Sequence, residues 1–487
     1  MEASTPDPRR WFALALLCGA FFMVILDAAI VTVALPSIQR KLSFSSVSLQ
    51  WVVSAYALTF AGLLLLGGRA ADLLGRRRVF VVGLAIFTIA SLLCGLSWSP
   101  AALIGARALQ GLGAAVMTPT ALSIIMTTFE DGSERNKALG IWGSLGGIGA
   151  TAAWLIGGLL VDGPGWQWIF FINIPVGIAA LALSPVLLRE SRASTAERSY
   201  DPAGALTITG ALGLLVYGVV EAPSNGWGDV RTVGPLAVSA ALLVAFVLVE
   251  LRQRAPLIPL RIFRSRTIVG ANSVMLFFGA VVYGMPFILT LYTQEVLGYS
   301  AVRFGLTSLV FPVGAAIGSI SGQAIVPRVG FRLMASAGMA LMAGGSFLLT
   351  QVSVGGTYFG DIFFGLLCFG PGVGLAFVTA SIAALAGVPE HESGLASGLS
   401  NTSFQIGAAL GVAAVATVSV SRTKDFLTAN VHATHLAGLD HGFQAAFLAS
   451  GLIAVLGVIA GLTLLGGPEA AGEPAPALEP AAVPLGD

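Results

Sequence analysis

Long apolar runs separated by short polar segments fill most of the chain between residues 11 and 466. A helix needs roughly 20 predominantly apolar residues to cross the hydrocarbon core of a bilayer. By that measure we count fourteen spanning runs, at 11–35, 48–67, 79–98, 101–127, 138–162, 166–188, 203–221, 232–251, 268–294, 303–326, 332–352, 357–387, 394–420 and 444–466. Because backbone polar groups in lipid must be satisfied within their own segment, the pattern predicts an all-α polytopic membrane protein.

Composition supports lipid as the solvent of this chain. Of its 487 residues, 56% are hydrophobic and 10% are charged, whereas a typical soluble domain is about 25% charged. The mean hydropathy is +0.88. The net charge of +1 leaves no basic excess for phosphate binding, which argues against a nucleic-acid partner.

The sequence carries no signature of an enzyme, and we expect neither a metal nor another cofactor. It has no phosphate-binding loop of the GxxxxGKS or GxxxxGKT type, so we do not expect ATP to drive the protein directly. The three cysteines lie in apolar runs without metal-ligand spacing: Cys18, Cys94 and Cys368. A metal cluster in the predicted loop before the last run is the alternative left open, through His432, His435 and His441.

Charge bias between the loops predicts the orientation. With the N-terminus in the cytoplasm, eighteen of the 25 Lys and Arg residues fall in inner segments, six fall in outer loops, and Arg107 lies inside a run. Such an excess of inner positive charge is typical of cytoplasmic loops. We therefore expect both termini in the cytoplasm, and disorder in the tail after Gly467, which is rich in Pro, Ala and Glu.

A weak internal repeat predicts two related helical bundles. The segment Gly67–Arg78 (GGRAADLLGRRR) ends the second run, and Gly322–Arg332 (GQAIVPRVGFR) ends the tenth, with glycines and an arginine at matching offsets and Pro327 where the first copy has Asp72. Six helices per bundle leave two runs between the halves. The predicted organisation is a cytoplasmic N-terminus (1–10), an N-terminal six-helix bundle (11–188), a cytoplasmic linker (189–202), two additional helices (203–251), a cytoplasmic loop (252–267), a C-terminal six-helix bundle (268–466) and a disordered tail (467–487).

Asp27 is the only acid placed deep in a predicted run. It lies about eight residues before the outer end of the run 11–35, hence roughly 12 Å deep at a rise of 1.5 Å per residue. Removal from water penalises an ionised carboxylate, so an acid at this depth is suited to binding and releasing a proton. The alternative is a structural acid held by neighbouring hydroxyls such as that of Thr32.

Arg107 is the only base inside a run, roughly 9 Å from the outer end of 101–127. Its guanidinium stays charged, so when buried it requires a carboxylate or several carbonyls around it. We predict that Arg107 lies near Asp27 and keeps that carboxylate ionised until a proton or substrate competes, with Gln110 in the same polar cluster. A structural Arg107 bonded only to carbonyls is the alternative.

The segment Gly67–Arg78 is predicted to be a basic turn between two spans. Gly68 and Gly75 permit close backbone approach and positive φ. Asp72 is suited to accept bonds from a neighbouring helix N-terminus or to pair with Arg76. We name this segment the cytoplasmic latch, because such contacts would hold the two bundles together on the cytoplasmic side. In the alternative, its arginines only fix the topology.

Several stretches, taken in order, resemble the motifs of the major facilitator superfamily and, within it, of the fourteen-span drug–proton antiporter family. The main four are Leu26–Gln39 (LDAAIVTVALPSIQ), Gly67–Arg78, Ala106–Leu122 (ARALQGLGAAVMTPTAL) and Leu139–Leu160 (LGIWGSLGGIGATAAWLIGGLL). Three further matches are Val216–Gly228, Leu291–Ser300 and Glu392–Gly411. The resemblance implies the major facilitator fold with two extra spans, assigns the first-span Asp27 to proton coupling or cation binding, and assigns the motif of Arg107 to proton transfer.

The fifth run departs from the family pattern at one point. The resemblance associates its glycine-rich motif with antiport, through positions that include Gly149, Gly157 and Gly158. The family's Gly-Pro pair is replaced here by Ala153-Trp154, so a bulky indole stands where a kinking residue is expected. This replacement leaves export and uptake both open, and Trp154 is a candidate cavity residue.

A substrate pocket is expected between the two bundles near mid-membrane. Aromatic and amide side chains in the runs that would line it suit planar, amphipathic or cationic compounds. The candidates are Tyr56, Phe277, Phe278, Tyr283, Asn401 and Gln405. For each of them, ordinary helix packing is the alternative.

The sequence thus favours a monomeric exporter of small amphipathic drugs, antibiotics or biocides in a bacterial cytoplasmic membrane. The proton gradient is its expected energy source, and the lipid bilayer, protons and a small drug-like substrate are its expected partners. A proton-coupled uptake symporter would use the same residues with opposite substrate flow. A non-transporting membrane sensor, the other alternative, would tolerate the loss of Asp27.

Overall fold

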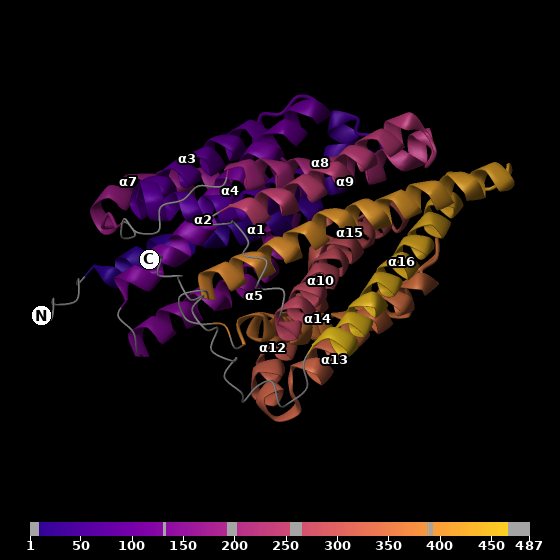
Figure 1. Ribbon diagram of the computed structural model, residues 1–487. Helices are drawn as coiled ribbons and strands as arrows, with labels where there is room; N and C mark the ends of the chain where they lie inside the picture. Colours follow the sequence, from indigo (N-terminus) through magenta and orange to yellow (C-terminus); the bar gives the residue numbers. More distant parts are fainter. Residues whose placement is uncertain are drawn as a thin grey trace, which may run out of the picture.

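The computed structural model describes residues 9–129, 133–191, 202–253, 265–386, 388 and 393–465, and every regular element in these ranges is helical (Figure 1). Most of the predicted N-terminal segment, linker, loop 252–267 and tail therefore lies outside the described residues. The side chain of Asp72 lies outside them as well, although its backbone is part of a helix.

The first half contains α1 (Arg10–Leu42), α2 (Trp51–Leu74), α3 (Arg76–Gly95), α4 (Pro100–Thr128), α5 (Ser133–Asp162), the short α6 (Trp168–Phe171) and α7 (Asn173–Leu187). Two further helices follow, α8 (Pro202–Asn225) and α9 (Val230–Arg252). The second half contains α10 (Arg266–Leu291), η3 (Tyr292–Val296), α11 (Ala301–Thr307), α12 (Val310–Val329), α13 (Phe331–Leu348), η4 (Leu349–Gln351), η5 (Tyr358–Ile362), α14 (Phe363–Leu385), α15 (Ser393–Ala429) and α16 (His435–Leu464).

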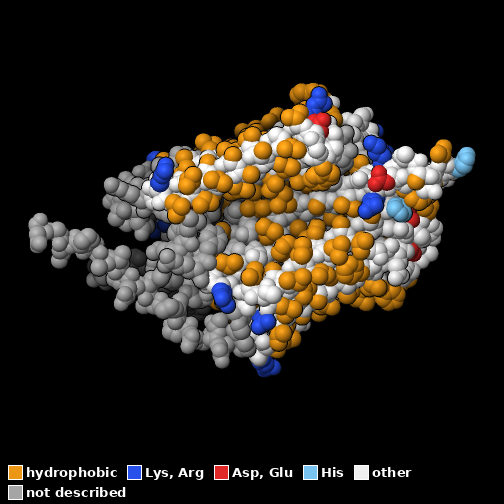
Figure 2. All heavy atoms as spheres, turned by 45° about the vertical axis from the view of Figure 1, so that its right-hand side comes forward, with side chains coloured by type: hydrophobic (Ala, Val, Ile, Leu, Met, Phe, Trp, Pro, Cys, Tyr) orange, Lys and Arg blue, Asp and Glu red, His pale blue; other side chains and the backbone are white. Residues whose placement is uncertain are grey.

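Within the described residues, eleven helical segments are long and apolar enough to cross a membrane. Three shorter apolar stretches accompany them, Trp51–Leu64, Thr151–Asp162 and Leu206–Val219. Hydrophobic side chains cover the flank of the molecule, whereas charged and histidine side chains lie toward its ends (Figure 2). The described part of the chain is thus all-helical, and many of its helices are long and apolar enough to cross a membrane.

Several helix boundaries differ from those predicted. In the second half, α15 continues past residue 420 to Ala429, and α16 begins at His435, so His435 and His441 lie in a helix and not in the predicted loop. The first run was expected to end at residue 35, but α1 continues through Pro36 to Leu42. The Gly67–Arg78 segment is not a loop: α2 continues to Leu74 and α3 begins at Arg76, so Gly75 alone separates them. Charge in this segment suggested a turn, whereas Ala, Leu and Arg are also strong helix formers.

The additional pair α8–α9 packs across the line where the two halves meet. Apolar residues of three helices form one cluster there: Ala57 and Leu58 of α2, Leu212 and Val216 of α8, and Ala408, Ala409 and Ala413 of α15. Thr417 of α15 donates a hydrogen bond to the carbonyl of Val219 in α8. The pair therefore contacts both halves, and α9 is held to α8 through the Ser239 hydroxyl, which donates to the Ala211 carbonyl.

The halves contact each other near one end of the molecule. We call the end where α1 begins and α16 ends the termini side, and the opposite end the far side. Near the far side, both carboxylate oxygens of Asp162 in α5 accept hydrogen bonds from the backbone N–H groups of Ala301 and Val302 at the start of α11. The amide of Gln294 donates to the carbonyl of Val33 in α1 over 3.0 Å. These contacts close the far side between the halves.

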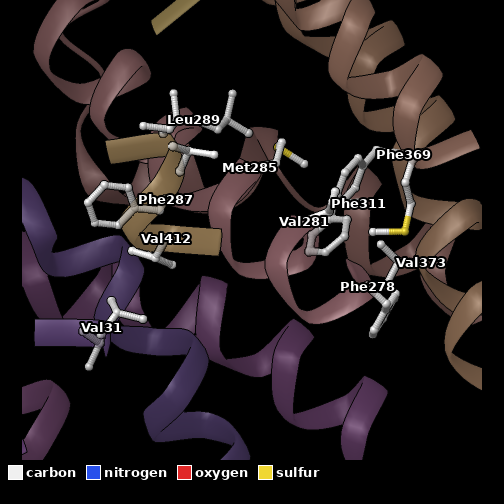
Figure 3. Close-up of a cluster of buried hydrophobic side chains, with 14 of the residues drawn as sticks. Val31, Phe278, Val281, Met285, Phe287, Leu289, Phe311, Phe369, Val373 and Val412 are labelled. Carbon is white, nitrogen blue, oxygen red and sulfur yellow. The ribbon is translucent and has the colours of Figure 1, made fainter. Parts of the chain in front are cut away.

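The second half has an aromatic and aliphatic core. Side chains from α10, α12, α14 and α15 gather there, and Val31 of α1 contributes from the first half (Figure 3). The rings of Phe311 and Phe369 lie 5.7 Å apart between centroids. Phe278 packs on Phe404 at 5.7 Å. Dense apolar packing fixes the position of α10 beside α14 and α15.

Candidate functional site

The predicted pair of deep charges is brought together in the first half. Nη1 of Arg107 in α4 donates to Oδ2 of Asp27 in α1 over 2.5 Å, and both side chains are buried. Arg107 also donates from Nε to the carbonyl of Val52, 2.9 Å away, and from Nη1 to Oε1 of Gln110, 2.7 Å away. Gln110 therefore belongs to the same cluster, as the sequence predicted.

Amide groups hold the other carboxylate oxygen of Asp27. Its Oδ1 accepts from Nε2 of Gln110 over 2.8 Å and from Nδ2 of Asn173 over 3.2 Å. Both amides also donate to the hydroxyl of Ser91, which itself donates to the carbonyl of Phe170. The Thr32 hydroxyl donates to the carbonyl of Ala29 instead of holding Asp27. We call Asp27, Arg107, Gln110, Asn173 and Ser91 the polar cluster.

Tyr56 lies against the polar cluster from α2. Its ring centroid is 4.3 Å from the guanidinium carbon of Arg107, a distance at which the cation is attracted to the ring face. The Tyr56 hydroxyl is buried and has no hydrogen-bond partner in the described part of the chain. Tyr56 is therefore a predicted substrate residue that the structure brings to the charges.

The cluster lies deep but nearer the far side. Arg107 is seven residues from the start of α4 at Pro100, which corresponds to about 10 Å along the helix. One positive and one negative charge compensate each other here, and every amide donor points at the carboxylate. A proton on Asp27 would leave the Arg107 charge uncompensated.

Asn173 and Ser91 were missed by the sequence analysis. Asn173 is an amide inside the sixth apolar run, where a polar side chain is expensive unless it finds a partner, and that signal could have identified it. Ser91 gives no such signal, because a serine in a helix can bond to its own backbone.

The cytoplasmic latch has a described partner that the sequence analysis did not name. Gly75 has φ +107°, and a Cβ atom there would lie 2.6 Å from the carboxylate of Glu190, so only glycine fits. Glu190 accepts from the backbone N–H of Arg77 over 3.1 Å and forms an ion pair with Arg78 at 3.6 Å. The backbone N–H of Arg76 donates to the carbonyl of Ser191.

Fewer contacts are described for the other two glycine and acid positions of the latch, Gly68 and Asp72. Gly68 lies at ordinary contact distance from Pro119 of α4, 3.5 Å from where its Cβ would be. The predicted contacts of Asp72 fall outside the described residues. The described latch contacts join α2, α3 and the segment after α7, all within the first half.

The glycine-rich motif of α5 has two roles in packing. Gly149 and Gly157 face Ile25 and Ile30 of α1, where an added Cβ would lie within 3.0 Å of a side-chain atom. Gly158 instead faces the backbone of Ala301 in α11. The helix runs without interruption through Ala153 and Trp154.

Trp154 joins the two halves. Its ring stacks on Phe304 of α11 at 5.2 Å and lies 5.3 Å from Phe311 of α12. Only 3% of Trp154 is exposed, and it lines neither of the two cavities described below. The indole that replaces the family's proline is thus part of the contact between α5 and the second half.

The other predicted substrate residues do not form one pocket. Phe278 and Tyr283 both pack on Phe404, and Gln405 is buried in α15. Phe277 lies against Gly457 of α16. Asn401 is half-buried in α15.

Two cavities accompany these elements. One of about 310 Å³ lies between α1, α5 and α7 in the first half, and Asn173 is part of its wall. The other, of about 420 Å³, lies on the far side between α10, α15, α16 and the residues that follow α1, with Glu295 and Lys424 in its wall. The first cavity therefore borders the polar cluster, and the second does not.

Comparison with known proteins identifies the family of the chain and several of its relatives. The profile of the Major Facilitator Superfamily matches residues 17–412. The puromycin resistance protein of Streptomyces alboniger is 39% identical over 451 residues, which cover 92% of this chain and 87% of that protein. The cephamycin export protein of Amycolatopsis lactamdurans is 40% identical over 417 residues, which cover 84% of this chain and 85% of that protein.

A solved structure shows the same fold at low sequence identity. A bacterial homologue of the human lysosomal transporter Spinster, in an inward-facing and unoccupied conformation, superposes with a TM-score of 0.68. The match covers 96% of this chain and 100% of that one, with 17% sequence identity. The chain thus has the same overall fold as that solved structure.

Proposed function

The chain belongs to the Major Facilitator Superfamily, and from this premise we propose that it exports small amphipathic, drug-like compounds across the cell membrane by proton antiport. Like its relatives, it is a membrane transporter and not an enzyme. Antibiotic resistance and export proteins match it over more than four fifths of its length, which supports drug efflux. The buried Asp27–Arg107 pair is the single observation that carries the proton coupling.

The proposal includes an organisation finer than the eleven described spans. We infer that α2, α5 and α8 also cross the bilayer, because each is long enough and contains an apolar stretch. Together with the eleven they make fourteen spans, arranged as two six-helix bundles with α8 and α9 between them. The positive-inside bias supports a cytoplasmic termini side. A monomer, powered by the proton gradient without a cofactor, completes the proposal.

The transport cycle follows from the charges. When the site faces outward, a proton neutralises Asp27, its bond with Arg107 weakens, and the substrate leaves. After reorientation the proton passes to the cytoplasm, the ion pair forms again, and a new substrate binds. The intact Asp27–Arg107 pair and the closed far side fit the second of these states. In this cycle proton binding and substrate binding oppose each other, which produces antiport.

The latch has a proposed role on the cytoplasmic side. Gly75 and Glu190 hold α2, α3 and the end of α7 as one unit. Such a unit would move as a rigid body when the halves separate or approach. The Asp72 contact with the second half remains part of this proposal.

Transport into proteoliposomes with an imposed pH gradient tests the function. Ethidium, a planar aromatic cation with two amino groups, is the probe. We expect the wild-type protein to move ethidium opposite to the proton flow, and Asp27→Asn to abolish the dependence on the gradient. Asp425→Asn, at an exposed acid of α15, is the matched control and should behave as wild type.

Each alternative predicts a different result in the same assay. Ethidium that moves in the direction of proton flow would establish a symporter. Gradient-driven transport that survives in Asp27→Asn would remove Asp27 from the coupling. Absence of any transport of drug-like probes by the wild-type protein would support a membrane sensor.

A further inference from the structure

The cavity between α1, α5 and α7 is bounded by apolar side chains. Its volume is about 310 Å³, and its wall includes Phe22 and Leu26 of α1, Leu145 and Ile156 of α5, and Val176 of α7. Val176 is 41% exposed on the flank of the molecule. Exposed apolar side chains on the flank of a membrane protein face lipid, so the Val176 side of the cavity wall lies toward the bilayer.

One polar side chain, that of Asn173, lies in this apolar wall. Its Nδ2 is committed to Oδ1 of Asp27 at 3.2 Å and to the hydroxyl of Ser91 at 3.0 Å. The amide orientation follows from these bonds, since a carboxylate only accepts. Its Oδ1 therefore makes none of the hydrogen bonds that join Asn173 to the polar cluster. Asn173 is 1% exposed, and Oδ1 has no donor among the described residues.

A buried acceptor without a donor is destabilising, so a donor from outside the chain that reached Oδ1 of Asn173 would lower the free energy. Water is a poor one here, because a buried water needs about two to four polar partners and this wall offers one. A lipid acyl chain would fill the cavity but has no donor. An apolar group that carries an N–H or O–H satisfies both the wall and the amide oxygen.

We propose that this cavity is a substrate subsite, which takes an apolar ring of an amphipathic compound and bonds its N–H or O–H group to Oδ1 of Asn173. The proposal rests on the proposed export function. The amide whose oxygen receives the substrate also donates from its nitrogen to Asp27. A substrate in the cavity therefore acts on one of the hydrogen-bond donors of that carboxylate. Entry from the Val176 side would bring a substrate from the bilayer to the proton site through α1, α5 and α7.

Gly19 provides a way to fill the cavity. It belongs to the wall, and a Cβ atom there would meet nothing within 4 Å. Gly19→Leu therefore adds volume at the cavity wall, and the Cβ of the new side chain meets no neighbour. Gly105 of α4 is the matched control, a helical glycine whose Cβ would also meet open space but which lies outside the cavity.

Binding of ethidium to the purified full-length protein, followed by fluorescence, tests the subsite. We expect Gly19→Leu to weaken ethidium binding by at least about tenfold, as expected when about 1.4 kcal/mol of binding is lost. Gly105→Leu should bind as wild type. Equal affinity in both variants, or a wild-type protein that binds no ethidium, would overturn the proposal.

The native cysteines give a second measurement that needs no variant. Cys18 belongs to the cavity wall, whereas Cys368 lies on α14 in the second half. We expect bound ethidium to slow alkylation of Cys18 by N-ethylmaleimide, read by mass spectrometry of peptides, and to leave Cys368 unchanged. Unaltered labelling of Cys18 by a protein that binds ethidium would place the ligand elsewhere and contradict the proposal.

Lipid occupancy and failure of the export function give separate signatures. If protein in phosphatidylglycerol nanodiscs protects Cys18 and added ethidium changes nothing, the occupant is an acyl chain and the subsite proposal is wrong. Loss of proton coupling would appear only in the liposome assay with Asp27→Asn. Protection of Cys18 is measured at equilibrium without a gradient, so it stands or falls independently of that result.

Discussion

The two halves bury opposite kinds of side chain in their first and fourth spans: charged in the first half and apolar in the second. In the first half, the first and fourth spans, α1 and α4, bury Asp27 against Arg107. In the second half, the first and fourth spans, α10 and α14, bury Phe278 and Phe369 in an apolar core (Figure 3). A buried ion pair contributes little net stability compared with apolar side chains of similar volume. The first half thus has a buried ion pair in these spans, whereas the second half has apolar side chains there.

Removal of one charge should have the largest effect on this comparison. In Arg107→Met the Asp27 carboxylate loses its counterion, which is expected to cost about 3–5 kcal/mol of folding free energy and to abolish coupled transport. The double variant Asp27→Asn with Arg107→Met should recover most of that stability, because no lone charge remains buried. Equilibrium unfolding of the purified proteins measures the stability.

The double variant also provides the control for folding. It should unfold near the wild-type midpoint while it fails to respond to a pH gradient. If it is no more stable than Arg107→Met alone, the lost stability comes from packing of the long arginine side chain and not from charge.

Removal of volume from the second half should lower stability without changing the coupling. Phe369→Ala creates a cavity beside Phe311 and is expected to cost about 3 kcal/mol, at the lower end for such a change because neighbouring rings can shift. The pH dependence of transport per folded molecule should remain as in wild type. A shifted pH profile in Phe369→Ala would show that the second half also participates in proton coupling.

The contact between the halves should give the smallest effect. Asp162→Asn weakens two hydrogen bonds to the start of α11 at an exposed position, so we expect a loss of about 1 kcal/mol from the closed far side. That corresponds to about a fivefold increase in the population open on the far side. Accessibility of a cysteine introduced at Val33 measures the population. An unchanged accessibility would mean that the Gln294 and Trp154 contacts are sufficient to close the far side.

Features that stand out from an apolar background could be predicted from the sequence. Asp27 and Arg107 were placed near each other because each is the deep charge of its run, and the structure joins them. Of the two latch glycines noted as permitting positive φ, Gly75 adopts it, whereas Gly68 is helical. The superfamily prediction is confirmed by the profile match.

Features that depend on distant partners could not be predicted. The role of Trp154 required Phe304 and Phe311, which follow it by about 150 residues and reach it only after the halves meet. Asn173 could bond to any polar group at its depth, and its choice of Asp27 depends on how α7 packs beside α1. Glu190 follows α7 in what appeared from sequence to be a linker, and only the fold brings it to Gly75.

Because of the position of α8, the two flanks at which the halves meet differ in structure. Where α2 meets α15, α8 packs on both, and lipid on that flank touches a third helix. Where α5 meets α11, the indole of Trp154 stacks directly on Phe304. A compound dissolved in the membrane therefore meets a different surface on each of these two flanks. If the halves rock, α2 or α15 slides along α8 on one flank, and the rings of Trp154 and Phe304 separate on the other. The resistance to that motion differs between the two flanks, so the axis of rotation need not pass through the centre of the protein.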